Sequence, residues 1–309
     1  MASVSSSRAD VATLAVVGPT ASGKSALALA IARRRIAAGR PTELVAVDAF
    51  TAYRRMDVAT AKPSPEDRAE VPHHLLDLRE PWEQLSVAEF QRLARAAIAD
   101  VRARGATPLL VGGSGLYFRA VVDDLTFPPT DPAVREGVTR RWQYDPAAGH
   151  AHLAALDPDA AARIEPGNLR RIVRALEVIE LTGQRFSAYD DAWDRYESVY
   201  PDLEVAYLEP AGEELKAAIR ARAERIVTDG LLEEARALRA LDRPLSRTAA
   251  QAIGYAEAFA VLDGELDEGE LAAAVAARTW RYAKRQRSWF RADPRCTPTT
   301  PDEVLARWE

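Results

Sequence analysis

The stretch LAVVGPTASGKSALALAIA, residues 14–32, decides the fold class of this chain. Its apolar start, residues 14–17, predicts a buried strand, and residues 24–38 predict an alanine-rich helix. Two more strands are predicted at residues 43–48 and 107–115, with helical segments between them. Strands that alternate with helices indicate an α/β fold, here a P-loop NTPase-like core whose parallel sheet is flanked by helices.

The pattern changes after this first block of strands and helices. Residues 122–196 contain helical segments interrupted by prolines and no clear strand, so we expect an all-helical insertion domain. A further strand and long helices follow it. We therefore predict a disordered tail at residues 1–12, a catalytic core built from residues 13–121 and 197–309, and the insertion between the two parts of the core.

The composition sets limits on the function. A chain of 309 residues with 48% hydrophobic residues has enough length to bury a sizeable core. A net charge of -5 excludes a uniformly basic surface, so any contact with a polyanion must be local. Cys296 is the one cysteine, which fits a reducing compartment, and no apolar run reaches the ~20 residues of a membrane span. We expect a monomeric, cytoplasmic protein without a membrane partner.

The loop between the first strand and the first helix has the full Gly-x4-Gly-Lys-Ser spacing of a phosphate site. Its glycines let backbone N–H groups turn inward, and the helix N-terminus and Lys24 add positive potential. Ser25 is the expected Mg²⁺ ligand. The alternative is a glycine-rich turn that serves packing alone. The predicted phosphate-binding residues are Gly18, Pro19, Thr20, Ala21, Ser22, Gly23, Lys24 and Ser25.

Two more features end strands at the same predicted edge of the sheet. Because ligands of open parallel sheets bind beyond the carboxyl ends of the strands, Asp48 should face the same crevice as Lys24. It fits a general base or a water-mediated Mg²⁺ ligand; the alternatives are a cap on the next helix or an ion pair with Arg54. The run VGGSGLY, residues 111–117, allows close backbone approach and places the Ser114 hydroxyl near a substrate.

With these features placed, the chain resembles the tRNA dimethylallyltransferases, the isopentenyl-transfer family that modifies the adenosine 3′ of the anticodon. The resemblance extends from residue 14 to residue 293. The motifs that carry it are GPTASGKS, YRRMDVATAKP, VPHHLLD, SVAEF, VGGSGLY, LDPDAAARIEP, RRIVRALEV, AIGY and YAKRQRSWFR.

The resemblance implies that the loop holds the diphosphate of dimethylallyl diphosphate rather than the triphosphate of ATP. The adenine N6 attacks the allylic C1 carbon, and pyrophosphate departs. Asp48 is then the catalytic base that accepts the N6 proton, and Thr20 is the catalytic residue that hydrogen-bonds the reacting end. Lys24, Ser25 and the cofactor Mg²⁺ stabilise the leaving diphosphate.

The resemblance also implies that the second partner is the anticodon stem-loop of tRNA, contacted in part by the insertion. Independently of it, residues 277–295 hold seven arginines or lysines against one aspartate. On a helix, three of these arginines share a face, which suits a phosphate backbone; a solvated cationic face is the alternative. The implied tRNA contacts are Asp48, Ala49, Phe50, Thr51, Ser114, Arg135, Arg170, Arg171, Ile172, Val173, Arg174, Arg281 and Arg285.

The chain departs from the family pattern at the run Asp48-Ala49-Phe50-Thr51, where the family has Asp-Ser-x-Gln. The base is retained, but the next hydroxyl is lost and the glutamine amide is replaced by a shorter side chain. Two rival functions stay open. Prenyl transfer to free AMP, ADP or ATP would explain the altered run, whereas phosphate transfer by an ATP-dependent small-molecule kinase would explain only the phosphate loop.

Overall fold

The chain folds into two compact units. The computed structural model describes residues 12–189, 193 and 195–309. One unit combines the described residues up to Val122 with Tyr200–Glu309, and the other is Asp123–Val199. The predicted boundaries are 121/122 and 196/197. Of the predicted disordered tail, residues 1–11 lie outside the described residues.

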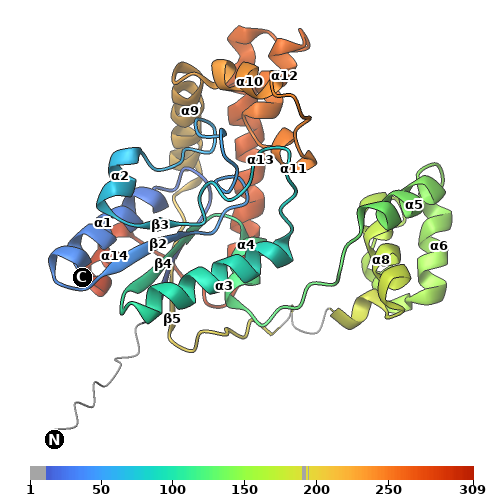
Figure 1. The fold of residues 1–309 in the computed structure, drawn as a ribbon, viewed down its shortest axis with the longest axis horizontal. Coiled ribbons are helices and arrows are strands. Elements are labelled where there is room, and N and C mark those ends of the chain that lie inside the picture. Colours follow the sequence, from blue (N-terminus) through green and yellow to red (C-terminus); the bar gives the residue numbers. More distant parts are fainter. Residues whose placement is uncertain (1–11, 190–192, 194) are drawn as a thin grey trace, which may run out of the picture. The chain divides into compact units, whose positions relative to one another are not determined.

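The first unit is built on one sheet of six strands, and all of its neighbouring strands run parallel (Figure 1). In spatial order, the strands are β3 (His73–His74), β2 (Thr42–Ala46), β4 (Thr107–Gly112), β1 (Thr13–Val17), β5 (Leu203–Leu208) and β6 (Pro298–Thr299). The predicted α/β class is therefore confirmed. The sequence prediction missed both edge strands, because two residues are too short a run to show the alternation of a strand.

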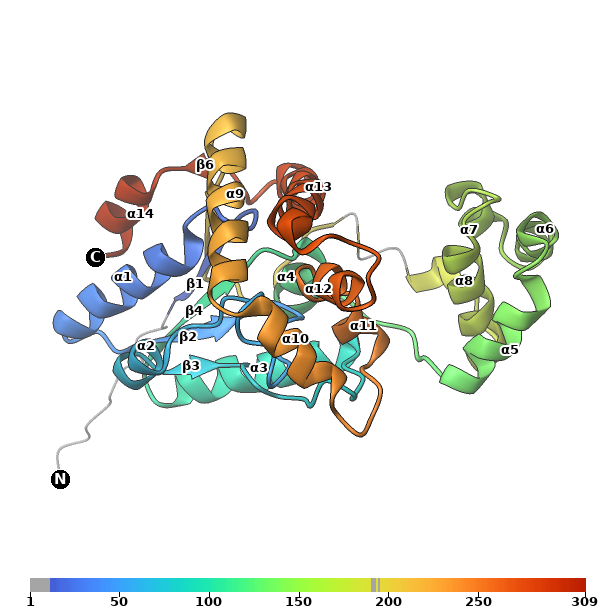
Figure 2. The same ribbon diagram turned by 90° about the horizontal axis from the view of Figure 1, so that it is seen from above.

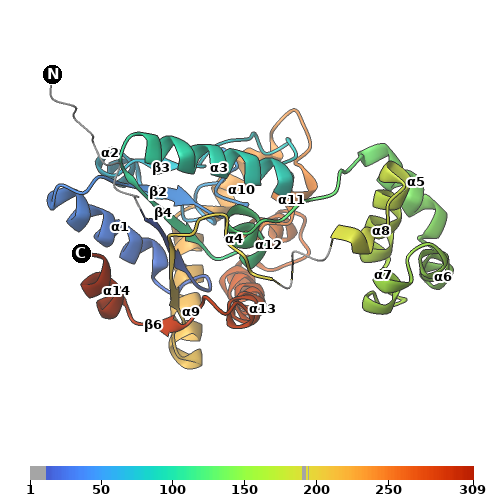
Figure 3. The ribbon, with the colours of Figure 1, turned by 90° about the horizontal axis from the view of Figure 1, so that it is seen from below.

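Helices cover both faces of this sheet (Figures 2 and 3). The first unit contains α1 (Lys24–Ala37), α2 (Pro65–Glu70), α3 (Val87–Ala103), α4 (Gly115–Val122), α9 (Gly212–Thr228), α10 (Leu231–Arg239), α11 (Arg247–Ala250), α12 (Tyr255–Leu262), the short 3-10 helix Glu268–Glu270, α13 (Leu271–Ala292) and α14 (Pro301–Trp308).

Alternate residues of β1 point to two separate cores, as the two-residue period of a strand requires. Leu14 and Val16 pack in a cluster with Ile31 of α1 and Trp308 of α14. Ala15 and Val17 belong to the larger cluster on the opposite face, which includes Phe90 of α3. Both cores therefore hold β1 in place, and with it the start of the loop that follows.

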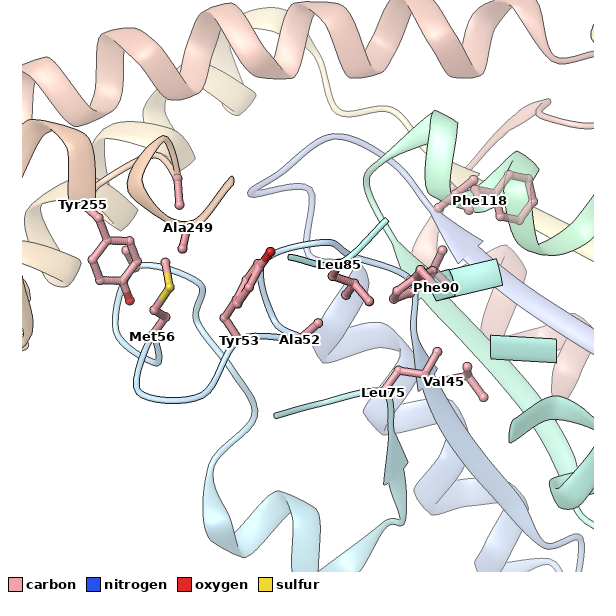
Figure 4. Packing of buried hydrophobic residues seen from close by; sticks show 14 of the residues in the cluster. Val45, Ala52, Tyr53, Met56, Leu75, Leu85, Phe90, Phe118, Ala249 and Tyr255 are labelled. Atoms are coloured by element: carbon pink, nitrogen blue, oxygen red, sulfur yellow. The ribbon is translucent and has the colours of Figure 1, made fainter. Parts of the chain in front are cut away.

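A long loop after β2 fills the space between the sheet and the helices α11 and α12. It carries Ala52, Tyr53 and Met56, all fully buried. Figure 4 shows these side chains between Phe90 on the side of the sheet and Tyr255 on the side of α12. The buried Lys62 ammonium fixes the far end of the loop by binding the Tyr53 carbonyl at 2.5 Å and two carboxylates.

The second unit is helical throughout the residues that the structure describes, apart from loops and one isolated bridge. It contains α5 (Pro132–Trp142), α6 (Pro146–Leu156), α7 (Pro158–Arg163), α8 (Leu169–Thr182) and the 3-10 helix Phe186–Tyr189. Its core packs Ile172 and Leu176 of α8 against Val138 and Leu153. In neither unit is a described helix long and apolar enough to span a membrane.

Candidate active site

The phosphate loop leaves β1 in a conformation that depends on its glycines. A Cβ atom on Gly18 would lie 2.5 Å from the Leu208 carbonyl oxygen, so no other residue fits there. Gly23 and Ala21 both have left-handed backbone angles, φ 83° and 64°. Among the described residues, no side chain caps the N-terminus of α1 and no carboxylate lies in its first turn. The N–H groups of this turn are therefore available to bind an anion held by the loop.

Lys24 lies inside the loop, where its ammonium donates to the Pro19 carbonyl at 3.0 Å. Burial and, after it, the nearby charge of Arg222 lower the pKa of Lys24 to about 8, although the charge of Asp48 opposes both effects. A lysine next to a second cation is stabilised in its charged form when an anion binds between them.

Asp48 lies two residues beyond the end of β2 and faces the same charges. Its Oδ1 accepts the Phe50 N–H at 2.8 Å. Burial raises the pKa of the Asp48 carboxyl, against the opposing effects of this hydrogen bond and of the Lys24 charge. Arg54 instead contacts Glu80 and the Asp77 carbonyl, so the alternative ion pair with Asp48 is not formed.

A cavity of about 80 Å³ lies beside these groups. Its lining includes the polar side chains of Thr20, Asp48 and Arg222 and apolar side chains such as Ile226 and Val275. The structure thus brings the predicted base and the predicted phosphate loop to one cavity. The complete lining is Thr20, Asp48, Phe50, Ala59, Thr60, Arg222, Ile226, Ala252, Ile253, Val275, Thr279 and Tyr282.

Arg222, on α9, is a site residue that the sequence prediction missed. Its guanidinium interacts electrostatically with both Asp48 and Lys24, and it donates to the Ala59 carbonyl at 3.2 Å. Burial lowers the pKa of Arg222, with the charge of Asp48 acting against it. No local motif marks this arginine, because it belongs to an ordinary helical run of charged and apolar residues.

Gln286, on α13, was also missed, although it lies inside a motif that carried the family resemblance. Its buried amide accepts the Thr20 N–H at 2.9 Å and donates to the Gly113 carbonyl at 2.7 Å. It therefore joins the phosphate loop to the loop after β4. One turn earlier, Tyr282 lines the cavity. Its hydroxyl interacts with the side chains of Ser114 and Gln286, and burial raises its pKa.

The three residues that follow Asp48 differ in their contact with the cavity. Phe50 lines the cavity, whereas Ala49 and Thr51 are half-buried outside its lining. The Thr51 hydroxyl lies 3.4 Å from the Asp48 carbonyl, at the limit of a hydrogen bond.

The arginines predicted to contact tRNA fall into two groups. Arg135 and Arg174 both bind the fully buried Glu177 carboxylate, at 2.9 Å each. Arg170 and Arg171 are exposed, and the described residues offer them no ion pair.

The two other members of the predicted α8 segment, Ile172 and Val173, are in the core of the helical unit. Their side chains support α8 from within and are not exposed to a partner. On α13, Arg281 and Arg285 are exposed, and Arg285 lies over the Tyr282 ring at 5.8 Å. Arg278 is instead paired with Glu257.

The low pKa of Lys24 predicts a pH dependence of anion binding. As the pH rises through about 8, Lys24 loses its charge, so the affinity for inorganic pyrophosphate should fall. Lys24→Ala should weaken binding roughly 10- to 100-fold at lower pH, the scale of one charged hydrogen bond. Calorimetric titration of both proteins between pH 6.5 and 9.5 checks this, since the ratio of affinities cancels the titration of pyrophosphate itself. A ratio that stays near one at all pH values would contradict the assignment.

The chain is similar to known proteins over most of its length. A family model described as IPP transferase matches residues 51–293. A tRNA dimethylallyltransferase of Kineococcus radiotolerans is 50% identical over 292 residues, which cover 93% of this chain and 90% of the relative. One from Bifidobacterium longum is 47% identical over 283 residues, covering 91% of this chain and 84% of the relative.

A solved crystal structure is also similar to this chain. The full-length tRNA isopentenylpyrophosphate transferase of Bacillus halodurans is similar with a TM-score of 0.67 at 36% identity, covering 96% of this chain and 94% of that chain. As its motifs predict, this chain belongs to the IPP transferase family, whose curated relatives are tRNA dimethylallyltransferases.

Proposed function

We propose that this protein transfers the dimethylallyl group of dimethylallyl diphosphate to N6 of the adenosine 3′ of the anticodon in tRNA, and releases pyrophosphate. The observation that carries the proposal is that Thr20 of the anion-binding loop and the half-buried Asp48 carboxylate line one cavity, in a chain of this family. An N6–C1 bond forms, the C1–O bond to the diphosphate breaks, and the N6 proton passes to a base.

The charges of the site match these steps. The N–H groups at the start of α1, together with Lys24 and Arg222, bind the diphosphate and stabilise the negative charge that grows on it as the C1–O bond breaks. Asp48 accepts the N6 proton, and its raised pKa makes it a better base than an exposed aspartate. Gln286 holds the backbone N–H of Thr20, which lines the cavity. There the Thr20 hydroxyl would hydrogen-bond the reacting end of the prenyl donor.

The donor set of the loop also fits Mg²⁺. Among the residues that the structure describes, no group of three or more histidine, cysteine, aspartate or glutamate side chains is arranged to hold a metal ion. Mg²⁺ does not need such a cage, because it keeps waters and substrate phosphates as ligands. We propose that the Ser25 hydroxyl, exposed in the first turn of α1, holds the ion. When bound, Mg²⁺ would neutralise part of the charge of the diphosphate.

We propose that the exposed arginines Arg170, Arg171, Arg281 and Arg285 contact the tRNA phosphates. Arg135 and Arg174 then act indirectly, because their ion pairs with Glu177 fix the start of the helical unit. The proposed contacts near the target base are Ala49, Phe50, Thr51 and Ser114. We also propose that the enzyme acts in the cytoplasm, where it would meet its tRNA substrate, and that it acts as a monomer.

Incubation with radiolabelled dimethylallyl diphosphate tests the proposal directly. The acceptor is either bulk tRNA lacking the modification or AMP. Label in the tRNA fraction supports the proposed function. Label in AMP alone would transfer the assignment to a free-nucleotide prenyltransferase. No transfer to either acceptor would contradict both and leave the kinase function to be tested with labelled ATP.

Asp48→Asn should slow dimethylallyl transfer by roughly 100-fold or more, the scale of a lost general base. An amide cannot take up the N6 proton, while both substrates should still bind. Single-turnover rates with prebound tRNA measure the effect. Asp100→Asn, which removes an exposed carboxylate on α3, is the matched control. Equal rates for Asp48→Asn and wild type would make Asp48 a structural residue.

Arg171→Glu and Arg285→Glu should each weaken tRNA binding and leave donor binding unchanged. Each lost phosphate contact should reduce the log–log slope of affinity against salt by roughly 0.7–0.9. Filter binding at several salt concentrations measures the slope. Arg40→Glu, an exposed arginine outside the proposed contacts, controls for net charge. Variants that keep the wild-type slope would show that these side chains face solvent in the complex.

A further inference from the structure

Glu234, on α10, holds the loop after β2 without the help of a cation. Its carboxylate accepts the backbone N–H groups of Asp57 and Val58 at 2.9 and 3.1 Å, and also the hydroxyl of Tyr255. Among the described residues, no lysine or arginine forms an ion pair with it. A half-buried carboxylate that receives three hydrogen bonds is held in a single orientation.

Tyr255 belongs to the same hydrogen-bond network as Glu234. It is the first residue of α12 and is fully buried, as Figure 4 shows beside Met56 of the same loop. Its hydroxyl donates to Glu234, the carboxylate that also accepts the N–H of Val58, the residue before Ala59. The backbone also packs closely here, since a Cβ atom on Gly254 would lie 2.7 Å from the Ala59 Cβ.

Ala59 links this network to the active site. Its carbonyl accepts the Arg222 guanidinium at 3.2 Å, and Ala59, Thr60 and Arg222 all line the cavity. Glu234 therefore binds the N–H of Val58, and the cation of the site binds the carbonyl of the next residue, Ala59.

Arg222 needs the hydrogen bond to Ala59 because the two nearby charges act on its guanidinium with opposite sign. The negative charge of Asp48 attracts it, and the positive charge of Lys24 repels it. A guanidinium released from Ala59 would move toward Asp48. It would then neutralise the base and leave the position from which it faces the phosphate loop.

We propose that Glu234 and Tyr255 are positioning residues, which act through Ala59 to hold Arg222 where it binds the diphosphate of the donor. The proposal rests on the proposed function only in naming the donor. The ligand class that it requires is a diphosphate.

A double-mutant cycle on pyrophosphate binding tests this. In the full-length chain, Glu234→Gln and Tyr255→Phe should each weaken pyrophosphate binding roughly 3- to 10-fold, the scale of one lost hydrogen bond. In an Arg222→Ala background, the same changes should have less than about a twofold further effect, because the residue they position is gone. Calorimetry gives the affinities, and thermal unfolding monitors the fold.

Two features keep the test specific. Glu233→Gln removes the neighbouring carboxylate of α10, which is exposed and forms an ion pair with Arg236 of the same helix, and it should leave binding unchanged. Tyr255→Phe retains the buried ring and removes one hydroxyl, so it remains informative if Glu234→Gln does not fold.

Equal losses with and without Arg222 would overturn the proposal, as would no loss in either variant. Pyrophosphate binding needs no tRNA and no transfer. A protein that shows the expected coupling but never prenylates tRNA would contradict the proposed function and leave the positioning role intact.

Discussion

The close approach of Gly18 to the Leu208 carbonyl is the constraint on which the site depends. β1 is bonded to β4 on one side and to β5 on the other, so the chain enters the phosphate loop from a fixed point. The absence of a side chain at Gly18 lets the loop begin against β5. The left-handed residues that follow then turn the first N–H groups of α1 toward the loop.

The site is assembled from half-buried charges that do not balance one another. Lys24 and Arg222 repel each other, and Asp48 attracts both. In a partly desolvated cavity, this surplus of positive charge favours a bound anion, while burial keeps Asp48 more basic than an exposed carboxylate. The same arrangement thus serves the departure of a diphosphate and the removal of a proton.

One helix, α13, connects the chemistry to the surface. Its buried face carries Gln286, which joins two active-site loops, and Tyr282 lies at the cavity wall. Its exposed face carries Arg281 and Arg285. A helix presents such different faces because successive residues are about 100° apart, so neighbouring residues in one basic motif have separate roles.

The sequence by itself determined the α/β class, the phosphate loop and the placement of Asp48 at the same edge of the sheet, because each follows from short-range spacing next to a strand. Only the tertiary structure decided that Arg222 faces Asp48, and that Gln286 binds Thr20 across 266 residues of sequence. The tertiary structure also decided which arginines of one segment are paired: Arg174 is bound to a buried carboxylate, whereas Arg171 is exposed. The physical reason is that burial and partners belong to the packing of distant elements, and no local pattern of residues encodes which of several equal charges will be enclosed.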